Sequence, residues 1–96
     1  MKVVDTDTGF IFSGNVKSVD HSKLIKECLI SKSGYRFLVF KFDSISVTSR
    51  VLSILTSYQK EHKNLKIVID SQSLYELFLD LNLVKCLNVR KVNKKH

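Results

Sequence analysis

The alternation of short apolar segments with amphipathic segments constrains the fold of this 96-residue chain more than any other feature. Residues 35–42 (YRFLVFKF) and 65–70 (LKIVID) are short and almost continuously apolar, which is typical of buried strands. Between them, residues 46–63 place apolar side chains such as Val51 and Leu55 on one face of a helix. A strand, a helix and a strand in succession predict parallel strands joined by a right-handed crossover.

Three further elements, two strands and a helix, are predicted before this unit. Residues 2–4 and 10–16 flank the turn-prone sequence DTDTG and are expected to pair as a hairpin. Residues 21–32 repeat apolar side chains at helical spacing, and Asp20 or Ser22 is available to cap that helix.

Two elements are predicted after it. Ser73 and Glu76 have the spacing of a capping box, so a third helix is expected to begin there and to bury Leu74 and Phe78. Residues 87–92 alternate in the manner of a short edge strand.

These elements predict one α/β domain over residues 1–92, followed by a loose basic tail at residues 93–96. The expected architecture is a mixed, mostly parallel sheet of four to five strands with about three helices. Residues 35–42 are almost entirely apolar on both alternating faces of the strand. That strand is therefore expected to be central and covered on both sides.

The net charge of +7 is unevenly distributed. From Lys85 onward there are five basic side chains and no acidic one, which leaves 11 basic and 9 acidic side chains in the first 84 residues. A nearly neutral body with a basic C-terminal segment is therefore expected. That segment provides an alternative function, nucleic-acid binding through phosphate contacts.

Aromatic side chains between Tyr35 and Phe42 interleave with Arg36 and Lys41, as in sheets that stack RNA bases. Since both faces of this strand are expected to be covered, core packing is the preferred interpretation of the aromatic residues. The sequence thus argues against nucleic-acid binding by the sheet.

No apolar run approaches the roughly 20 residues that cross a bilayer, and the acidic N-terminal sequence does not resemble a signal peptide. Cys28 and Cys86 lie in apolar surroundings without a CxxC pairing, so we expect reduced, packed thiols. These features predict a cytoplasmic protein without a transmembrane segment.

The motifs of common enzyme classes are missing from the sequence. The three glycines are isolated, which excludes a P-loop and a dinucleotide-binding fingerprint. His21, His62 and His96 have no metal-ligand spacing around them, so neither a metal nor a cofactor is expected. His62 is interpreted as a favourable charge partner for a helix C-terminus.

Asp43 and Asp70 follow the two central strands, where α/β proteins often place functional groups. Asp is also common where a strand gives way to a turn, and we assign neither residue a catalytic role. Thr48 and Ser49 have no nearby general base in the sequence. A non-enzymatic protein is therefore predicted.

The order of elements and three segments resemble the STAS domain, a module shared by sulphate transporters and bacterial anti-sigma-factor antagonists. Residues 9–29 (GFIFSGNVKSVDHSKLIKECL) resemble the opening strand, turn and first helix of that family. Residues 37–58 (FLVFKFDSISVTSRVLSILTSY) resemble its central strand and second helix, and residues 74–89 (LYELFLDLNLVKCLNV) its third helix and last strand. The resemblance implies a single STAS-like fold.

In the antagonists of this family, a partner kinase phosphorylates a Ser or Thr at the start of the second helix, and this modification abolishes binding. Alignment of the apolar helix positions places Thr48 and Ser49 on the family's paired hydroxyl residues. Val47 stands at the position of the family's Asp, and Arg50 at that of its Gly. The resemblance thus implies possible phosphorylation of Ser49 or Thr48 and a partner-binding surface of Ser46, Val47, Thr48, Ser49 and Arg50.

Ordinary helix capping is the competing interpretation of these hydroxyl residues. Ser46 is the preferred cap if the helix begins at Val47.

The partner implied by the resemblance is a protein. It is either a kinase of the anti-sigma-factor type, in a bacterial regulatory phosphoprotein system, or a subunit of a lipid-transport ABC system that contains a small STAS accessory subunit.

Overall fold

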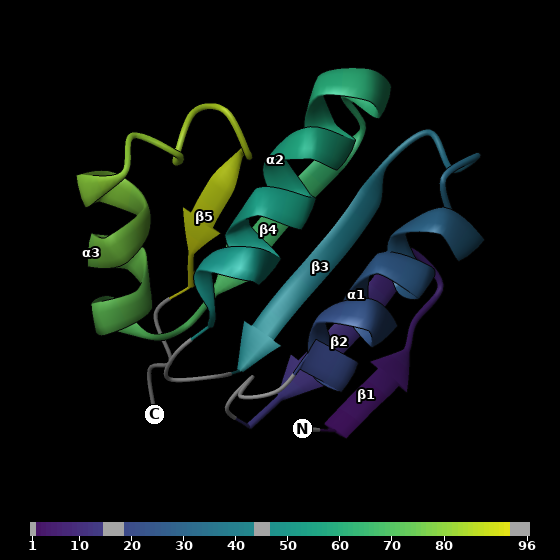
Figure 1. The fold of residues 1–96 in the computed structure, drawn as a ribbon, viewed down its shortest axis with the longest axis horizontal. Coiled ribbons are helices and arrows are strands. Elements are labelled where there is room, and N and C mark those ends of the chain that lie inside the picture. Colours follow the sequence, from purple (N-terminus) through teal and green to yellow (C-terminus); the bar gives the residue numbers. More distant parts are fainter. Residues whose placement is uncertain (1, 15–18, 44–46, 93–96) are drawn as a thin grey trace.

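The structure, a computed structural model, describes residues 2–14, 19–43 and 47–92 (Figure 1). In chain order the elements are β1 (Lys2–Asp5), β2 (Gly9–Ser13), α1 (Val19–Ser31), β3 (Leu38–Asp43), α2 (Ser49–His62), β4 (Leu65–Ile69), α3 (Gln72–Asp80) and β5 (Val89–Lys91). The predicted α/β class, with a mixed sheet of five strands and three helices, is confirmed. The predicted tail at residues 93–96 lies outside the described residues.

The strands lie in the sheet in the same order as in the sequence, β1-β2-β3-β4-β5. β1 and β2 form the predicted antiparallel hairpin, in which Val3 pairs with Phe12. The other neighbours are parallel, with Phe12 opposite Phe42, and Phe42 opposite Ile69. β5 is the predicted short edge strand.

All three helices pack on one side of this sheet. α1 crosses in front of β2 and α2 in front of β4 in Figure 1. Each crossover moves one strand further in the same direction, and right-handed crossovers of that kind leave their helices on the same face. Within residues 2–14, 19–43 and 47–92 no helix lies on the other face of β3, so the expectation that the strand at residues 35–42 is covered on both sides is wrong.

The burial of the strands follows this one-sided arrangement. Side chains that face the helices are fully buried, among them Phe40 in β3 and Ile67 in β4. Their neighbours Lys41 and Val68 are half-buried on the opposite face. Residues 65–70 were expected to form a buried strand by the same reasoning, and only alternate residues of β4 belong to the core.

Aromatic side chains form the centre of the core. The Phe12 and Phe42 rings stack with their centroids 5.3 Å apart, and the Phe10 and Phe40 rings meet edge to face at 5.9 Å. Leu55 from α2 and Phe78 from α3 belong to the same cluster. The interleaved aromatic residues of β3 therefore serve core packing, as the sequence predicted for Phe40 and Phe42.

Tyr35 and Phe37 do not share that role. β3 begins at Leu38, and these two side chains lie in the preceding turn with 42% and 55% of their surfaces exposed. The sequence placed them in the strand because their spacing continues its alternation.

The helix starts differ from the predicted ones. α1 begins at Val19, so Asp20 and Ser22 lie in its first turn and do not precede it. α2 is capped by Thr48 and α3 by Ser71, whose side-chain oxygens accept from the Val51 and Leu74 amides. The predicted caps Ser46 and Ser73 are therefore wrong; Ser46 lies outside the described residues, and Ser73 lies within α3.

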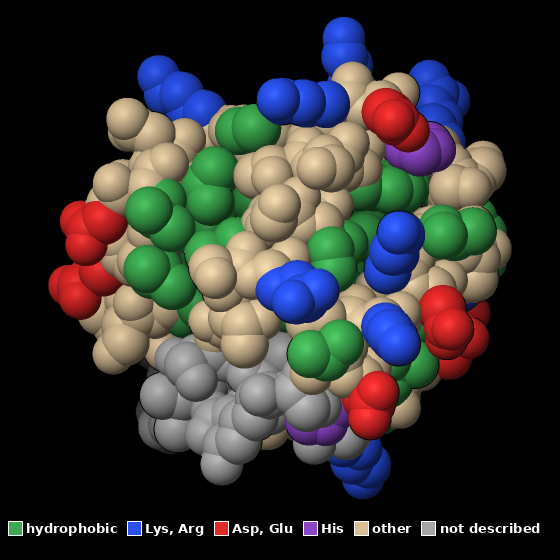
Figure 2. Space-filling model, in the orientation of Figure 1, with side chains coloured by type: hydrophobic (Ala, Val, Ile, Leu, Met, Phe, Trp, Pro, Cys, Tyr) green, Lys and Arg blue, Asp and Glu red, His purple; other side chains and the backbone are tan. Residues whose placement is uncertain are grey.

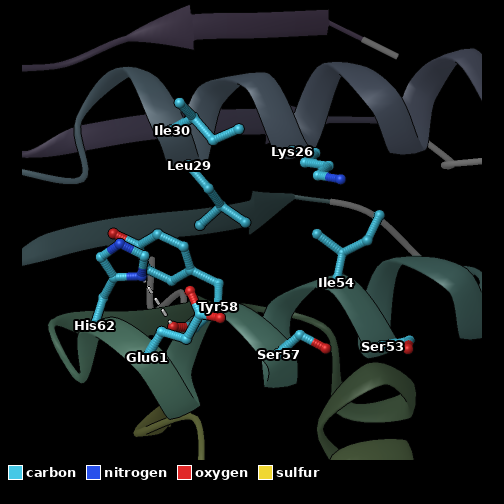
Figure 3. Close-up of a pocket in the computed structure, with 9 residues that line it drawn as sticks. All are labelled: Lys26, Leu29, Ile30, Ser53, Ile54, Ser57, Tyr58, Glu61 and His62. Carbon is cyan, nitrogen blue, oxygen red and sulfur yellow. Dashed lines mark hydrogen bonds between the residues drawn. The ribbon is translucent and has the colours of Figure 1, made fainter.

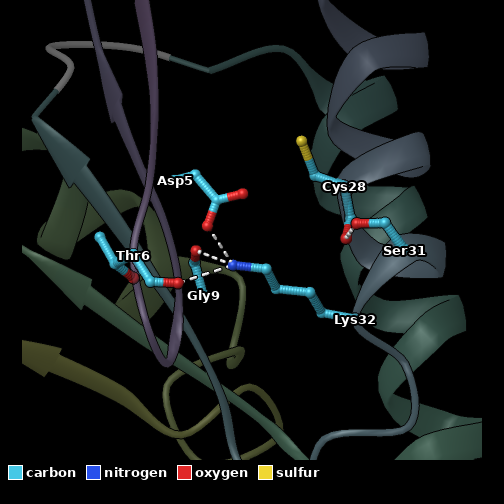
Figure 4. Close-up of polar contacts among 6 residues, drawn as sticks. All are labelled: Asp5, Thr6, Gly9, Cys28, Ser31 and Lys32. Carbon is cyan, nitrogen blue, oxygen red and sulfur yellow. Dashed lines mark hydrogen bonds and ion pairs between the residues drawn. The ribbon is translucent and has the colours of Figure 1, made fainter.

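The buried Lys32, directly after α1, forms hydrogen bonds to the β1–β2 hairpin (Figure 4). Lys32 Nζ lies 2.6 Å from Asp5 Oδ1 and donates to the Thr6 and Gly9 carbonyls at 2.7 and 2.9 Å. The ammonium also lies 4.3 Å from the centroid of the Phe10 ring. Its charge is thus balanced by three oxygens and an aromatic face, which is what a buried cation requires.

Candidate functional site

The first turn of α2 holds the residues that the sequence singles out. Thr48 is half-buried, and its Oγ1 accepts a hydrogen bond from the Val51 amide at 3.3 Å. Val51 is fully buried in the core, so the helix start is fixed to the sheet beneath it. Thr48 therefore has a structural role as the cap, whatever else it does.

Ser49 and Arg50 lie on the exposed side of the same turn. The first turn contains no acidic residue, and within the described part of the chain no carboxylate forms an ion pair with Arg50. A cation at a helix N-terminus opposes the helix dipole. Arg50 is thus placed unfavourably for helix stability, and an anionic group from outside the chain would relieve that.

The remaining residues of the predicted surface contribute less. Val47 is half-buried and packs against the core, which removes most of its side chain from any partner. Among the described residues, the accessible part of the predicted surface is therefore Ser49 and Arg50, with Thr48 beside them.

The carboxylates that follow the central strands lie at the carboxyl edge of the sheet. Asp43 ends β3 and Asp70 follows β4, and both are half-buried. Asp43 and Asp70 line neither the groove between α1 and α2 nor the hollow that Val39 and Arg90 line. Within residues 2–14, 19–43 and 47–92, no three His, Cys, Asp or Glu side chains are grouped to hold a metal ion.

A groove between α1 and α2 was not predicted from the sequence. It has a volume of about 350 Å³, and Leu29, Ile54 and Tyr58 form its apolar walls (Figure 3). Lys26 borders it on α1, and Glu61 on α2. The helical periods of both segments are visible in the sequence, but the gap between the two helices depends on how they pack.

His62 lines the groove and is held against its own helix. His62 stacks on the Tyr58 ring at 4.2 Å, and its Nδ1 lies 3.2 Å from the Tyr58 carbonyl oxygen rather than facing a serine hydroxyl. Burial raises the pKa of the Tyr58 phenol, and the Asn64 side chain offsets part of that rise. The phenol is therefore neutral at physiological pH. His62 does lie in the last turn of α2, as predicted.

The two thiols have different environments. Cys28 is buried, and the pKa of its thiol is raised by burial and by the charges of Glu27 and Asp5, with a smaller opposing effect from Lys32. It is thus an unreactive core residue, as predicted. Cys86 is exposed, so the expectation that it is packed is wrong.

Among the residues that the structure describes, no helix has both the length and the apolar character needed to cross a bilayer. Comparison with protein-family models, curated proteins and solved structures finds no match to this chain.

Proposed function

We propose that this protein is a non-enzymatic protein-interaction module of the STAS type that docks its partner through Ser49 and Arg50 at the start of α2. The observation that carries the proposal is an exposed hydroxyl beside an exposed cation, on a helix start that a cap and a buried valine hold in place. Such a turn presents its side chains in a fixed geometry, which lowers the entropy lost on binding.

Phosphorylation would control the same surface. A phosphate on Ser49 adds about −1.5 to −2 charge next to the helix N-terminus and Arg50, both of which favour an anion. The phosphate would then form an ion pair with Arg50. Arg50 would no longer be available to contact an acidic group of the partner. Ser49 is the preferred acceptor, because the Thr48 hydroxyl is engaged by the Val51 amide.

The proposed partner is a protein of one of two kinds. A kinase of the anti-sigma-factor type would both bind and modify this turn. Alternatively, the membrane or ATPase subunits of a lipid-transport ABC system would bind it as an accessory subunit, and no modification would be needed. Detection of phosphoserine at position 49 by mass spectrometry of protein isolated from its own cells would favour the first kind.

Quantitative affinity purification from the native host tests the docking surface. Arg50→Glu is compared with Lys60→Glu, which makes the same charge change at an exposed position near the other end of α2. We expect recovery of the specific partner to fall about tenfold or more with Arg50→Glu, and to stay within about twofold with Lys60→Glu. Equal recovery of every partner with both variants would refute the proposed surface.

A further inference from the structure

The face of the sheet opposite the helices is open among the described residues. The strand pairing places Ile11, Lys41, Val68 and Arg90 in one row across β2 to β5. None of these side chains belongs to the buried core. An open hollow of about 480 Å³ lies on this face, with Val39 and Arg90 among its lining residues. The face is therefore available to a partner.

Three cations converge on this face. Lys41 and Arg90 stand in the same row on β3 and β5, and Lys66 lies on β4 between them, two residues earlier. Strand separations of about 4.8 Å and a rise of about 3.3 Å per residue put their Cα atoms about 8–10 Å apart. Asp43 lies on the same face of β3, two residues beyond Lys41, and Asp70 follows β4, so the acidic side chains are at the carboxyl end of this face and Lys66 is toward the other end.

An exposed aromatic ring borders the same cations. Phe37 immediately precedes β3 and is 55% exposed. Lys66 Nζ lies 4.7 Å from the centroid of this ring, and Arg36 Cζ lies 5.9 Å from it. Positive charge and an aromatic surface therefore occur together at the edge of the open face where β3 begins.

The helix side of the molecule carries charged side chains of both signs. Figure 2 shows acidic and basic side chains both present there, spaced among neutral and hydrophobic ones.

The charges select among possible occupants. A second copy of this chain packed face to face would bring Lys41, Lys66 and Arg90 against the same cations, which is repulsive. A membrane surface would need several protruding apolar groups at the centre of the face, whereas the exposed Phe37 ring lies at its edge and the central residues Val39 and Val68 are half-buried between long basic side chains. A chain of phosphates with bases that can stack satisfies both the cations and the ring.

We propose that the open face binds single-stranded nucleic acid, with phosphates at Lys41, Lys66 and Arg90 and a base stacked at Phe37. The sequence argued against this because both faces of β3 were expected to be covered. The site is separate from Ser49 and Arg50 and does not depend on the proposed function.

Fluorescence anisotropy of the full chain with a labelled oligo-dT or oligo-U strand tests the proposal. The double variant Lys41→Ala, Lys66→Ala is compared with Lys23→Ala, Lys60→Ala, which removes the same charge from exposed helix positions. We expect at least about a tenfold loss of affinity for the sheet variant and less than about twofold for the helix variant. Phe37→Ala is expected to weaken binding about fivefold or more.

Several outcomes would overturn the proposal. One is no binding at about 50 mM salt, where phosphate contacts are strong. Another is an equal loss for the sheet and helix variants, which would indicate nonspecific attraction to the net charge. A third is that the oligonucleotide does not bind, whereas vesicles containing phosphatidylserine or polyglutamate bind through Lys41 and Lys66. That result would assign the face to another partner. Circular dichroism verifies that each variant is folded, and Arg50→Ala should leave oligonucleotide affinity within about twofold because it lies outside this face.

Discussion

At the scale of single residues, the close contact between β2 and β3 depends on Gly9, which has no side chain. Gly9 pairs with Val39 across the two strands, and the Thr8 carbonyl accepts from the Val39 amide at 2.9 Å. A Cβ atom at Gly9 would lie 1.9 Å from the Val39 carbonyl oxygen. Only glycine therefore permits this approach of the two backbones.

Substitution of two glycines tests this directly. Gly9→Ala is expected to lower the free energy of unfolding by about 2 kcal/mol or more, because backbone atoms must move apart. Gly34→Ala has no atom within 4 Å of the new Cβ and should leave the stability unchanged or raise it by up to about 1 kcal/mol. Urea unfolding of both variants measures the difference. Similar stabilities would show that β2 and β3 do not approach this closely.

Residue-level roles were the hardest to predict from the sequence. The apolar pattern identified Phe40 and Leu55 as core candidates through their periods, since burial of one face is a local property of the sequence. The buried Lys32 was not foreseen, because its partners Asp5, Thr6 and Gly9 lie 23 to 27 residues away in the chain. Nothing in the local sequence distinguishes it from an exposed lysine.

At the scale of elements, the start of α2 divides two neighbouring hydroxyl residues between two roles. Thr48 accepts from the Val51 amide, whereas Ser49 is an exposed residue of the first turn. Several Ser and Thr residues precede the apolar face of this helix, so the sequence could not decide which one caps it. Which of these residues caps the helix depends on where the chain leaves the sheet, and the loop geometry determines that point.

The division of roles predicts unequal effects on stability. Thr48→Ala is expected to lower the free energy of unfolding by about 1 kcal/mol, because the Val51 amide loses its acceptor. Ser49→Ala should change it by less than about 0.5 kcal/mol, since the side chain is exposed and alanine favours the helix. Thermal or urea unfolding distinguishes the two. A larger effect of Ser49→Ala than of Thr48→Ala would contradict this assignment. Ser49 would then be the cap, and Thr48 would carry the free hydroxyl.

At the scale of the whole molecule, the strand order decides what the surface offers. The alternating elements were sufficient to predict a mixed sheet with three helices, because each local period is strong. They did not predict that every crossover would move in the same direction, since the order of strands is fixed by contacts between distant segments. The open face, with Lys41 and Lys66 on it, follows from that order alone.

The one-sided sheet is the central claim, since the helix-side docking turn and the open basic face both depend on it. Adjacent residues of β4 test it most directly, because Ile67 is fully buried toward the helices and Val68 points to the other face. Ile67→Thr removes apolar contacts and buries a hydroxyl, so a loss of about 2–4 kcal/mol in the free energy of unfolding is expected. Val68→Thr should lose less than about 1 kcal/mol, because threonine suits a partly exposed strand. The measurement is urea unfolding of the two variants beside the unaltered chain. Equal, large losses would mean that both faces of the sheet are covered and would contradict the account.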